Sequence, residues 1–491
     1  MNSEPKITRR DLLRLAAGTG LATAVAGAVP AWLETAARVE AAPSRQSWAA
    51  LARRLRGRLL RPGDAAYANY PSPFNLRYAN VRPAGIVLCS SPSDVIEAVN
   101  FARVTGTPIA ARGGGHSYGG YSTTRGLLVD LSRLNAVSVG SGVASFGAGA
   151  RNGDVAAALP AHSVAIPSGR CPSVGLSGLL LGGGFGFSSR KFGLTCDSLL
   201  ETQIVTADGR LRTCNAQEHS DLFWACRGGG GGNFGINVAY KLRTFPVGTV
   251  SIYKLVWPWA AAAAAIHEMQ AASFHAPDEF SLRLGAIVTP AAKYVVAIGQ
   301  YFGPRAELTD LLKPVLATNP DTQMIVERHY WDGYGFLALN QAKVALANRS
   351  SFLDAPLSDG AVATALRWLE RWPGGIESSA SMFSWGGAIN RVATDATAFV
   401  HRDKHFLFQV ETLWNRGDPA AIAQANLAWV DGVYGAMRPS FSGQAYQNFI
   451  DPALRDWPRE YYGGNLARLR RIKRTYDPGH LFRFPQGIPP A

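Results

Sequence analysis

The stretch of sequence best suited to chemistry runs from Arg112 to Ser122 and reads RGGGHSYGGYS. It places five glycines in eleven positions around one histidine, His116. Glycine loses more conformational freedom on folding than any other residue, so such a run indicates a backbone that approaches another group closely or adopts positive φ. The sequence therefore predicts a loop that contacts a flat or anionic ligand, with His116 at its centre.

Two further glycine clusters lie in the first half of the chain, in GRCPSVGLSGLLLGGGFGFSS and in FWACRGGGGGNFGI. Glycine removes the side chain that would hold the backbone away from an extended diphosphate, and it lets amide N–H groups point at the phosphates. The G-x-G within GGGFGFSS lacks the early strand, phosphate-binding helix and later acidic residue of a classical dinucleotide-binding fold. Tight loops between packed strands are the alternative interpretation of all three clusters.

The five cysteines form no C-x-x-C pair, and with the nine histidines they form no zinc-binding pattern. We therefore expect no metal site. An odd number of cysteines in an exported chain leaves at least one thiol that is reactive, buried, or bonded to a group other than cysteine. The positions are Cys89, Cys171, Cys196, Cys214 and Cys226.

Residues 1–42 have the pattern of an export signal: a charged start, a modest apolar stretch and small residues with A-x-A character. Arg9 and Arg10, followed by Asp-Leu-Leu, resemble a twin-arginine signal, which carries proteins already folded around a cofactor. An ordinary secretory signal is the alternative. A membrane anchor is disfavoured because the stretch is rich in Gly, Ala and Thr and contains Pro30. We expect export to the periplasm or the extracellular space, with no stable membrane insertion after removal of the signal.

Composition excludes several classes of protein. A chain of 491 residues, 47% hydrophobic, is too long for one hydrophobic core and too apolar for disorder, so it fits two or three globular domains. The formal net charge is +14, yet the basic residues are scattered and never form a run of five or six. We interpret this charge as favouring solubility or an acidic substrate, and we expect no nucleic-acid partner. The sequence leaves the oligomeric state open.

The first half of the chain contains α/β units that end at the glycine loops. Residues 84–89 and 108–112 are predicted strands, and residues 94–104 between them are a helix capped near Ser93. Asp208-Gly209 predicts the turn of a hairpin. These elements would hold each glycine cluster at the end of a strand or hairpin.

The pattern changes over residues 249–440, where alternating strands flank alanine-rich helices and glycine clusters nearly vanish. One antiparallel sheet backed by helices fits this pattern. Near the ends of the mature chain, leucines at helical spacing predict a helix over residues 48–61, and residues 466–472 predict another that stops at Asp477-Pro478. AYQNFID, which begins at Ala445, is a predicted strand.

Taken together, RGGGHSYGGYS, GRCPSVGLSGLLLGGGFGFSSRKFGL, SDLFWACRGGGGGNFGI and YYGGNLARLRRIKRTYDPGHLF resemble the berberine bridge enzyme-like branch of the vanillyl-alcohol oxidase/p-cresol methylhydroxylase flavoproteins. The four motifs occur in the family's order. The resemblance implies an α+β fold in which the FAD domain is made from two parts, residues 46–248 and residues 441–491. Residues 249–440 would form an inserted substrate domain.

The resemblance also implies how FAD is held. In such enzymes a loop histidine bonds to the 8α carbon of the flavin, and His116 matches it; a cysteine often adds a thioether at flavin C6, and Cys171 matches that residue. A valine at position 174 resembles the oxidases more than the dehydrogenases. The other implied cofactor-binding residues are Arg112, Gly113, Gly114, Gly115, Ser117, Gly175, Gly178, Gly182, Gly183, Gly184, Gly186, Asn233, Gly235, Ile236, Asn448 and Asn465.

Oxidation of an alcohol by flavin needs a base that takes the hydroxyl proton. Relatives place a tyrosine over the ring in a Y-x-N-[YF] pattern, so Tyr446 is the candidate base, although Phe449 stands where some relatives have a second tyrosine. A free tyrosine has a pKa near 10 and would need a cation or the flavin to lower it. Gln409 and Glu411 alternate on a predicted strand of the substrate domain and are candidate catalytic partners, a solvated strand face being the alternative.

These expectations combine into an exported FAD oxidase that acts on an alcohol carbon of a small molecule, preferably a sugar or oligosaccharide, and reduces O2 to H2O2. An oxidative tailoring enzyme for a polycyclic or alkaloid natural product is the first alternative. A flavin dehydrogenase or a flavin-binding protein without turnover is the second.

Overall fold

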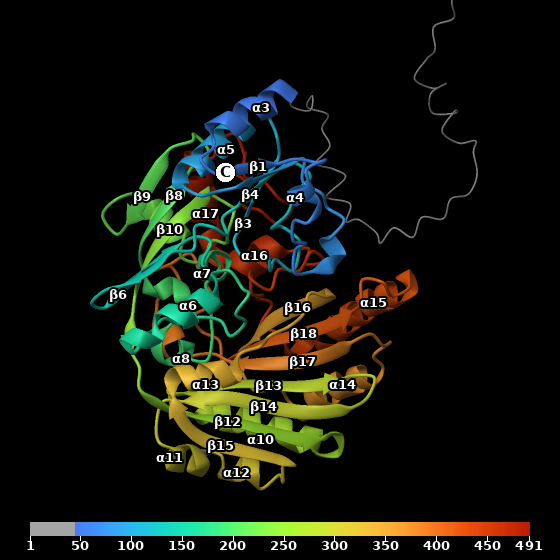
Figure 1. Ribbon diagram of the computed structural model, residues 1–491. Helices are drawn as coiled ribbons and strands as arrows, with labels where there is room; N and C mark the ends of the chain where they lie inside the picture. Colours follow the sequence, from blue (N-terminus) through green and yellow to red (C-terminus); the bar gives the residue numbers. More distant parts are fainter. Residues whose placement is uncertain (1–44) are drawn as a thin grey trace, which may run out of the picture.

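The computed structural model describes residues 45–491, and Figure 1 shows two units stacked on one another. The first half of the chain and the C-terminal helices make the upper unit in that view, and the sheet and helices of residues 249–440 make the lower one. The export signal predicted for residues 1–42 lies outside the described residues. Among residues 45–491, no helix is both long and apolar enough to span a bilayer.

The first unit opens with the predicted strand, helix and strand. Strands β2, β4 and β3 are parallel, and β1 adds an antiparallel edge in the order β1-β2-β4-β3. Helix α5 is capped by Ser91, two residues before the predicted cap, because the carboxylate of Asp94 accepts the Ser91 N–H at 3.1 Å. The bounds are α3 (Arg45–Arg54), β1 (Arg58–Leu60), β2 (Gly85–Leu88), α5 (Pro92–Thr105), β3 (Ile109–Arg112) and β4 (Leu127–Asp130).

The helix predicted over residues 48–61 ends at Arg54, and residues 58–60 form strand β1 instead. A Cβ at Gly57 would lie 2.0 Å from the Leu88 carbonyl oxygen, so glycine lets the chain turn tightly against β2. Asp94 accepts the Gly57 N–H at 3.2 Å. The helix therefore ends because of the tertiary contact of Gly57, and not because of a local signal in the sequence.

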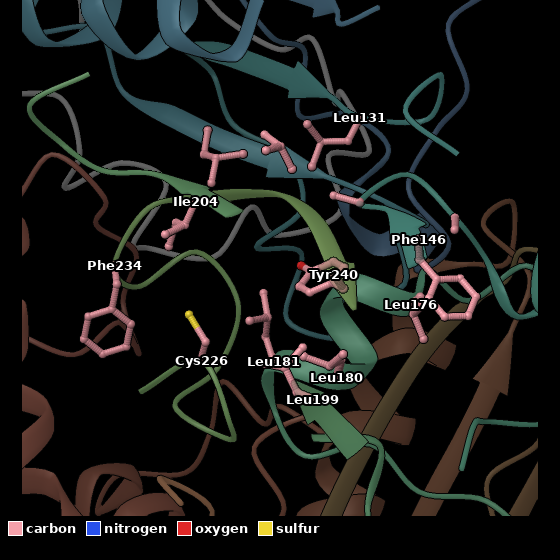
Figure 2. Packing of buried hydrophobic residues seen from close by; sticks show 14 of the residues in the cluster. Leu131, Phe146, Leu176, Leu180, Leu181, Leu199, Ile204, Cys226, Phe234 and Tyr240 are labelled. Atoms are coloured by element: carbon pink, nitrogen blue, oxygen red, sulfur yellow. The ribbon is translucent and has the colours of Figure 1, made fainter. Parts of the chain in front are cut away.

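A second, antiparallel sheet of five strands has the order β5-β6-β10-β8-β9. The predicted turn Asp208-Gly209 joins β8 to β9, with Gly209 at φ 78°. Figure 2 shows Leu176, Leu180 and Leu181 of α7 in the core with Tyr240 of β10. The bounds are β5 (Val137–Val139), β6 (Val143–Gly147), α6 (Asn152–Ala158), α7 (Leu176–Leu181), β8 (Leu199–Val205), β9 (Leu211–Asn215), α9 (Ser220–Ala225) and β10 (Ile236–Arg243). This core fixes the glycine loops that precede and follow α7.

The second unit is a seven-stranded antiparallel sheet backed by helices, which confirms the prediction for residues 249–440. Its order is β15-β12-β14-β13-β17-β18-β16, and Figure 1 shows α10, α14 and α15 along it. The bounds are β12 (Thr249–Pro258), α10 (Ala262–His275), β13 (Phe280–Val288), β14 (Lys293–Tyr301), β15 (Thr322–His329), β16 (Ala345–Leu353), α14 (Asp359–Glu370), β17 (Glu377–Ser384), β18 (Phe406–Trp414) and α15 (Ala420–Met437).

The two faces of this sheet differ in character. Alternate residues of β13, such as Leu282, Leu284 and Ala286, belong to the apolar core that the helices cover. The residues between them, among which is Arg283, lie on the opposite face, because successive side chains of a strand alternate. That opposite face carries the residues that reach the first unit.

The C-terminal segment returns to the first unit. Helices α16 (Trp457–Tyr462) and α17 (Leu466–Tyr476) contribute Tyr461, Leu469 and Ile472 to the core of the first half. The remaining short elements are α4 (Ala65–Ala68), β7 (Val164–Ala165), α8 (Ser189–Phe192), β11 (Phe245–Pro246), α11 (Arg305–Leu311), α12 (Lys313–Leu316) and α13 (Tyr330–Leu337).

The strand predicted at AYQNFID is wrong, because these residues form an irregular segment. Ala445 donates its N–H to the Glu460 carbonyl at 2.9 Å, and Phe449 donates to the Tyr446 carbonyl at 2.9 Å in a turn. The backbone hydrogen bonds of this segment thus go to helix α16 and to a turn rather than to a neighbouring strand. The apolar and polar residues alternate here because the chain passes between the two units.

Candidate active site

A cavity of about 1090 Å³ lies between the two units. Its walls come from all three glycine clusters of the first unit, from the C-terminal segment, and from β13, β17 and β18 of the second. The structure thus brings segments more than 300 residues apart in sequence to one site, from Gly113 to Phe449. No group of three or more His, Cys, Asp or Glu within residues 45–491 is arranged to hold a metal.

His116 sits in the cavity wall at the end of β3. Its Nε2 lies 3.0 Å from Ser173 Oγ, and its ring stacks on Phe74 with centroids 4.0 Å apart. Burial lowers the pKa of the imidazole to about 4, and the positive charges of Arg151 and Lys343 add to the shift. The imidazole is therefore neutral at neutral pH, and in the tautomer whose Nε2 donates to Ser173 Oγ the ring lone pair is on Nδ1.

Cys171 lies on the neighbouring loop and also lines the cavity. Asn152 Nδ2 donates to the Cys171 carbonyl at 3.0 Å and the Val174 N–H donates to it at 3.1 Å, so the loop is fixed from both sides. Burial raises the pKa of the Cys171 thiol, against the opposing charge of Arg170. Within the described part of the chain it is the one cysteine that keeps partial exposure.

The two loops meet through glycine backbones. A Cβ at Gly114 would lie 2.2 Å from the Gly175 nitrogen, and a Cβ at Gly175 would lie 2.3 Å from the Gly114 nitrogen. The amides of five successive residues, 114 to 118, donate to no protein acceptor within residues 45–491. Consecutive free N–H groups form an anion-binding concavity.

This arrangement fits FAD. The free amides suit a diphosphate, the elongated cavity has space for a dinucleotide, and a neutral imidazole and a thiol stand together in its wall. Of the residues predicted to bind FAD, those that line the cavity are Gly113, Gly114, Gly115, His116, Ser117, Cys171, Val174, Gly175, Gly178, Gly186, Asn233, Gly235, Ile236 and Asn448.

Five other predicted residues stand behind the wall: Arg112, Gly182, Gly183, Gly184 and Asn465. Arg112 holds the loop from beneath, since its Nε donates to the Ser122 carbonyl and its Nη1 to the Pro71 carbonyl, both at 2.9 Å. Asn465 Nδ2 donates to the Thr394 carbonyl at 2.7 Å. These side chains orient the loops rather than reach into the cavity.

Tyr446 lines the cavity, and its hydroxyl is buried among aromatic rings. The oxygen accepts the Gly184 N–H at 3.0 Å and Asn448 Nδ2 at 3.1 Å. Burial raises the pKa of this phenol, and the two hydrogen bonds oppose the shift only in part. A phenol that acts as a base near neutral pH needs a lowered pKa. Among residues 45–491, no cation lowers the pKa of Tyr446.

Gln409 and Glu411 line the cavity together from β18. Gln409 Nε2 donates to Glu411 Oε2 at 3.4 Å. Burial and the negative charge of Glu377 raise the pKa of Glu411 to about 7, against Arg283 and Arg170. A carboxyl that titrates near neutral pH is suited to take and release a proton.

The lining residues that the sequence analysis did not predict include Tyr118, Arg170 and Arg283. The hydroxyl of Tyr118 hydrogen-bonds Gln409 and is close to Glu411 and Cys171, each of which acts on its pKa. Arg283 is the one charged residue in FSLRLGAIV, an otherwise apolar or small strand. A charge inside such a strand is the signal that could have marked it, because burying an ion is costly without a function or a partner.

A two-part FAD domain with a separate sheet over the same cavity defines a flavin-linked oxidoreductase. The family model described as FAD binding domain matches residues 83–215, and the one described as Berberine and berberine like matches residues 445–489. "Uncharacterized FAD-linked oxidoreductase YgaK" of Bacillus subtilis is 36% identical over 89% of this chain and 98% of its own length. "Carbohydrate oxidase" of Microdochium nivale is 30% identical over 88% of this chain and 92% of its own length.

Solved structures agree. Physcomitrella patens BBE-like 1 superposes with a TM-score of 0.82 at 31% identity, covering 90% of this chain and 99% of its own. Berberine bridge enzyme from Eschscholzia californica gives 0.83 at 26%, covering 91% and 99%. The chain belongs to the berberine bridge enzyme-like family, and it is an FAD-linked oxidoreductase.

Proposed function

We propose that this oxidoreductase is an exported oxidase that converts an alcohol carbon of a carbohydrate to a carbonyl and passes the electrons to O2. The observation that carries the substrate class is the sheet wall of the cavity, where Arg283 of β13 and Gln409 and Glu411 of β18 lie beside Phe383 of β17. Several donors and acceptors on one wall suit a polyhydroxylated ring, whereas a polycyclic alkaloid needs mainly apolar surface. The 30% identical carbohydrate oxidase supports the same class.

His116 and Cys171 would hold FAD covalently. The low pKa of His116 keeps its imidazole nucleophilic, and the tautomer in which Nε2 donates to Ser173 Oγ would leave the Nδ1 lone pair for attachment. The thiol of Cys171 must lose its proton before it bonds, and Arg170 favours that loss. With two covalent bonds to FAD, the protein would not need to enclose the cofactor to retain it. The cavity would then keep room for a sugar.

Glu411 would take the proton from the substrate hydroxyl, with Gln409 and Tyr118 beside it. Its pKa of about 7 makes the carboxylate available near neutral pH, whereas the raised pKa of Tyr446 and its two accepted hydrogen bonds favour a structural phenol. FAD, when bound, supplies the acceptor for the hydride that leaves the carbinol carbon. Val174, in the wall three residues after Cys171, supports oxidase rather than dehydrogenase behaviour.

A substrate panel tests this proposal on the purified flavoprotein. Neutral mono- and oligosaccharides, aromatic alcohols and alkaloids are added without oxygen, and bleaching of the visible flavin absorbance is followed. We expect bleaching by sugars and, under air, one H2O2 for each substrate oxidised. Bleaching by aromatic alcohols or alkaloids alone would instead identify a tailoring enzyme, and bleaching by sugars without peroxide would identify a dehydrogenase.

Export is proposed separately from catalysis, on the twin-arginine pattern of residues 1–42. Replacing Arg9 and Arg10 by lysine should leave the protein inside an expressing bacterium, with its activity unchanged in the cell extract.

A further inference from the structure

Two arginines from different units face each other across the substrate side of the cavity. Arg170 precedes Cys171 on the loop of the first unit, and Arg283 lies on β13 of the second. Both line the cavity and keep part of their surface, and the charge of Arg283 lowers the pKa of Arg170. Two like charges are thus held close together at the cavity.

Neither guanidinium has an ionic partner among residues 45–491. Within residues 45–491, no carboxylate oxygen lies within 4.0 Å of a nitrogen of either side chain, while other ion pairs of the chain meet that limit. Arg170 Nη1 donates to the Leu337 carbonyl at 3.5 Å, and Arg283 Nη2 donates to Ser381 Oγ at 3.3 Å. Each guanidinium carries five N–H donors, so most of them stay unused.

Two buried arginines elsewhere in the described chain make shorter hydrogen bonds than Arg170 and Arg283 do. Arg402 pairs with both oxygens of Asp197, at 2.8 and 2.7 Å, and also donates to Thr397 at 2.9 Å. Arg190 donates to the carbonyls of Trp385 and Ala276, at 2.6 and 2.9 Å. Arg402 therefore has an ionic partner that Arg170 and Arg283 lack, and Arg190, which also lacks one, donates to two carbonyls at shorter distances.

The nearby carboxyls do not neutralise the pair. A carboxylate in a close salt bridge has a lowered pKa. Burial instead raises the pKa of Glu411 to about 7 and also raises the pKa of Glu377, and Arg283 opposes both shifts only in part. Burial therefore disfavours the charged form of both acids, whereas arginine stays charged.

The sheet leaves space for a ligand over Arg283. In register, Gly285 of β13 stands opposite Ser381 of β17, which stands opposite Gln409 of β18. A Cβ at Gly285 would lie 3.3 Å from Arg283 Nη1, so glycine lets the guanidinium fold over the sheet. Gly285 and Ser381 carry little or no side chain above the sheet, and Gln409 and Glu411 of β18 line the cavity beside them.

We propose that the substrate is an acidic sugar whose carboxylate binds between Arg170 and Arg283 while its hydroxyls contact Gln409 and Glu411. The inference rests on the proposed carbohydrate oxidase function and narrows its substrate class to sugar acids such as uronates. Guanidinium and carboxylate match in shape and form paired, charge-assisted hydrogen bonds. The net charge of +14 adds long-range attraction for an anionic sugar.

Matched pairs of sugars test the proposal. Galactose and galacturonate, glucose and glucuronate, and the corresponding disaccharides are compared by flavin reduction and by kcat/KM. We expect the wild type to prefer the acid, with a KM for the acid that rises with salt. Arg283→Gln should lower kcat/KM for the acid on the order of ten- to a hundredfold more than for the matched neutral sugar, mainly through KM. Arg170→Gln should act in the same sense.

Arg305→Gln, at an exposed position of α11, removes the same charge away from the cavity and should leave both sugars unchanged. Flavin content is measured for every variant. An equal loss on acid and neutral sugars, or a shifted flavin potential without a change in acid preference, would overturn the inference, because the arginines would then serve the cofactor.

The outcomes separate this inference from the proposed function. If neutral sugars are oxidised and sugar acids are not, the substrate inference fails and the carbohydrate oxidase stands. If no sugar is oxidised, the proposed function fails. A binding measurement with a sugar acid then tests the anion site by itself. A rise in melting temperature with galacturonate that Arg283→Gln abolishes would support the anion site, and no such rise with any sugar acid would refute it.

Discussion

At the scale of single residues, the site depends on groups whose pKa values move in different directions. The same burial that keeps His116 neutral, with a pKa of about 4, brings Glu411 up to about 7. Tyr446, at the meeting point of the two units, has its hydroxyl fixed by Gly184 and Asn448. His116 would thus bond the cofactor, and Glu411 would exchange protons with a substrate. Tyr446 packs between the two units.

Glu411→Gln should lower kcat on the order of a hundredfold or more, because the amide cannot accept the proton. In the wild type, kcat/KM should rise with pH through about 7 as the carboxyl loses its proton, and this step should vanish in the variant. Glu377→Gln removes a charge that raises the pKa of Glu411, so its midpoint should lie at lower pH. The measurement is the pH profile of flavin reduction by stopped flow.

Tyr446→Phe is the competing variant, because it removes the hydroxyl and keeps the ring. It should keep the pH step and most of the turnover. If Tyr446→Phe instead abolishes the step while Glu411→Gln keeps it, the base is the tyrosine.

At the scale of elements, the sequence predicts what local pattern determines and misses what packing determines. Helix α5, the hairpin at Asp208-Gly209 and the start of α17 follow from local signals, although α5 begins two residues before its predicted start. Strand β1 replaces the end of a predicted helix because Gly57 turns against Leu88. Glycine motifs and the family resemblance predict His116 and Cys171 as cofactor residues, and both line the cavity, whereas Arg170 and Arg283 come together only through the packing of the inserted sheet against the loop.

Gly114→Ala tests the glycine cradle. The added Cβ would meet the Gly175 backbone at 2.2 Å, and backbone cannot rotate aside, so we expect a loss of about 1–3 kcal/mol of stability and little bound FAD. Thermal unfolding and the ratio of flavin to protein are measured. Gly435→Ala in α15 meets no atom within 4 Å and should be neutral or stabilising by up to about 1 kcal/mol. Equal flavin content in the two variants would contradict the cradle.

At the scale of the whole molecule, two hydrophobic cores face each other across one cavity. The first holds the glycine loops and the C-terminal helices, and the second holds the sheet that brings Arg283 and Glu411 to the opening. A third, smaller cluster of aromatic residues around Tyr446 joins them. Because neither unit alone contains both cofactor groups and polar substrate groups, the site exists only in the assembled chain.

Intact mass under denaturing conditions tests the central claim, that FAD is bonded to this chain at His116 and Cys171. The account predicts the mass of the polypeptide plus one FAD in the wild type, in His116→Ala and in Cys171→Ala, and no added mass in the double variant. Peptide mapping should find the flavin on the remaining residue in each single variant. A wild-type chain without added mass, or an adduct that persists in the double variant, would contradict the account.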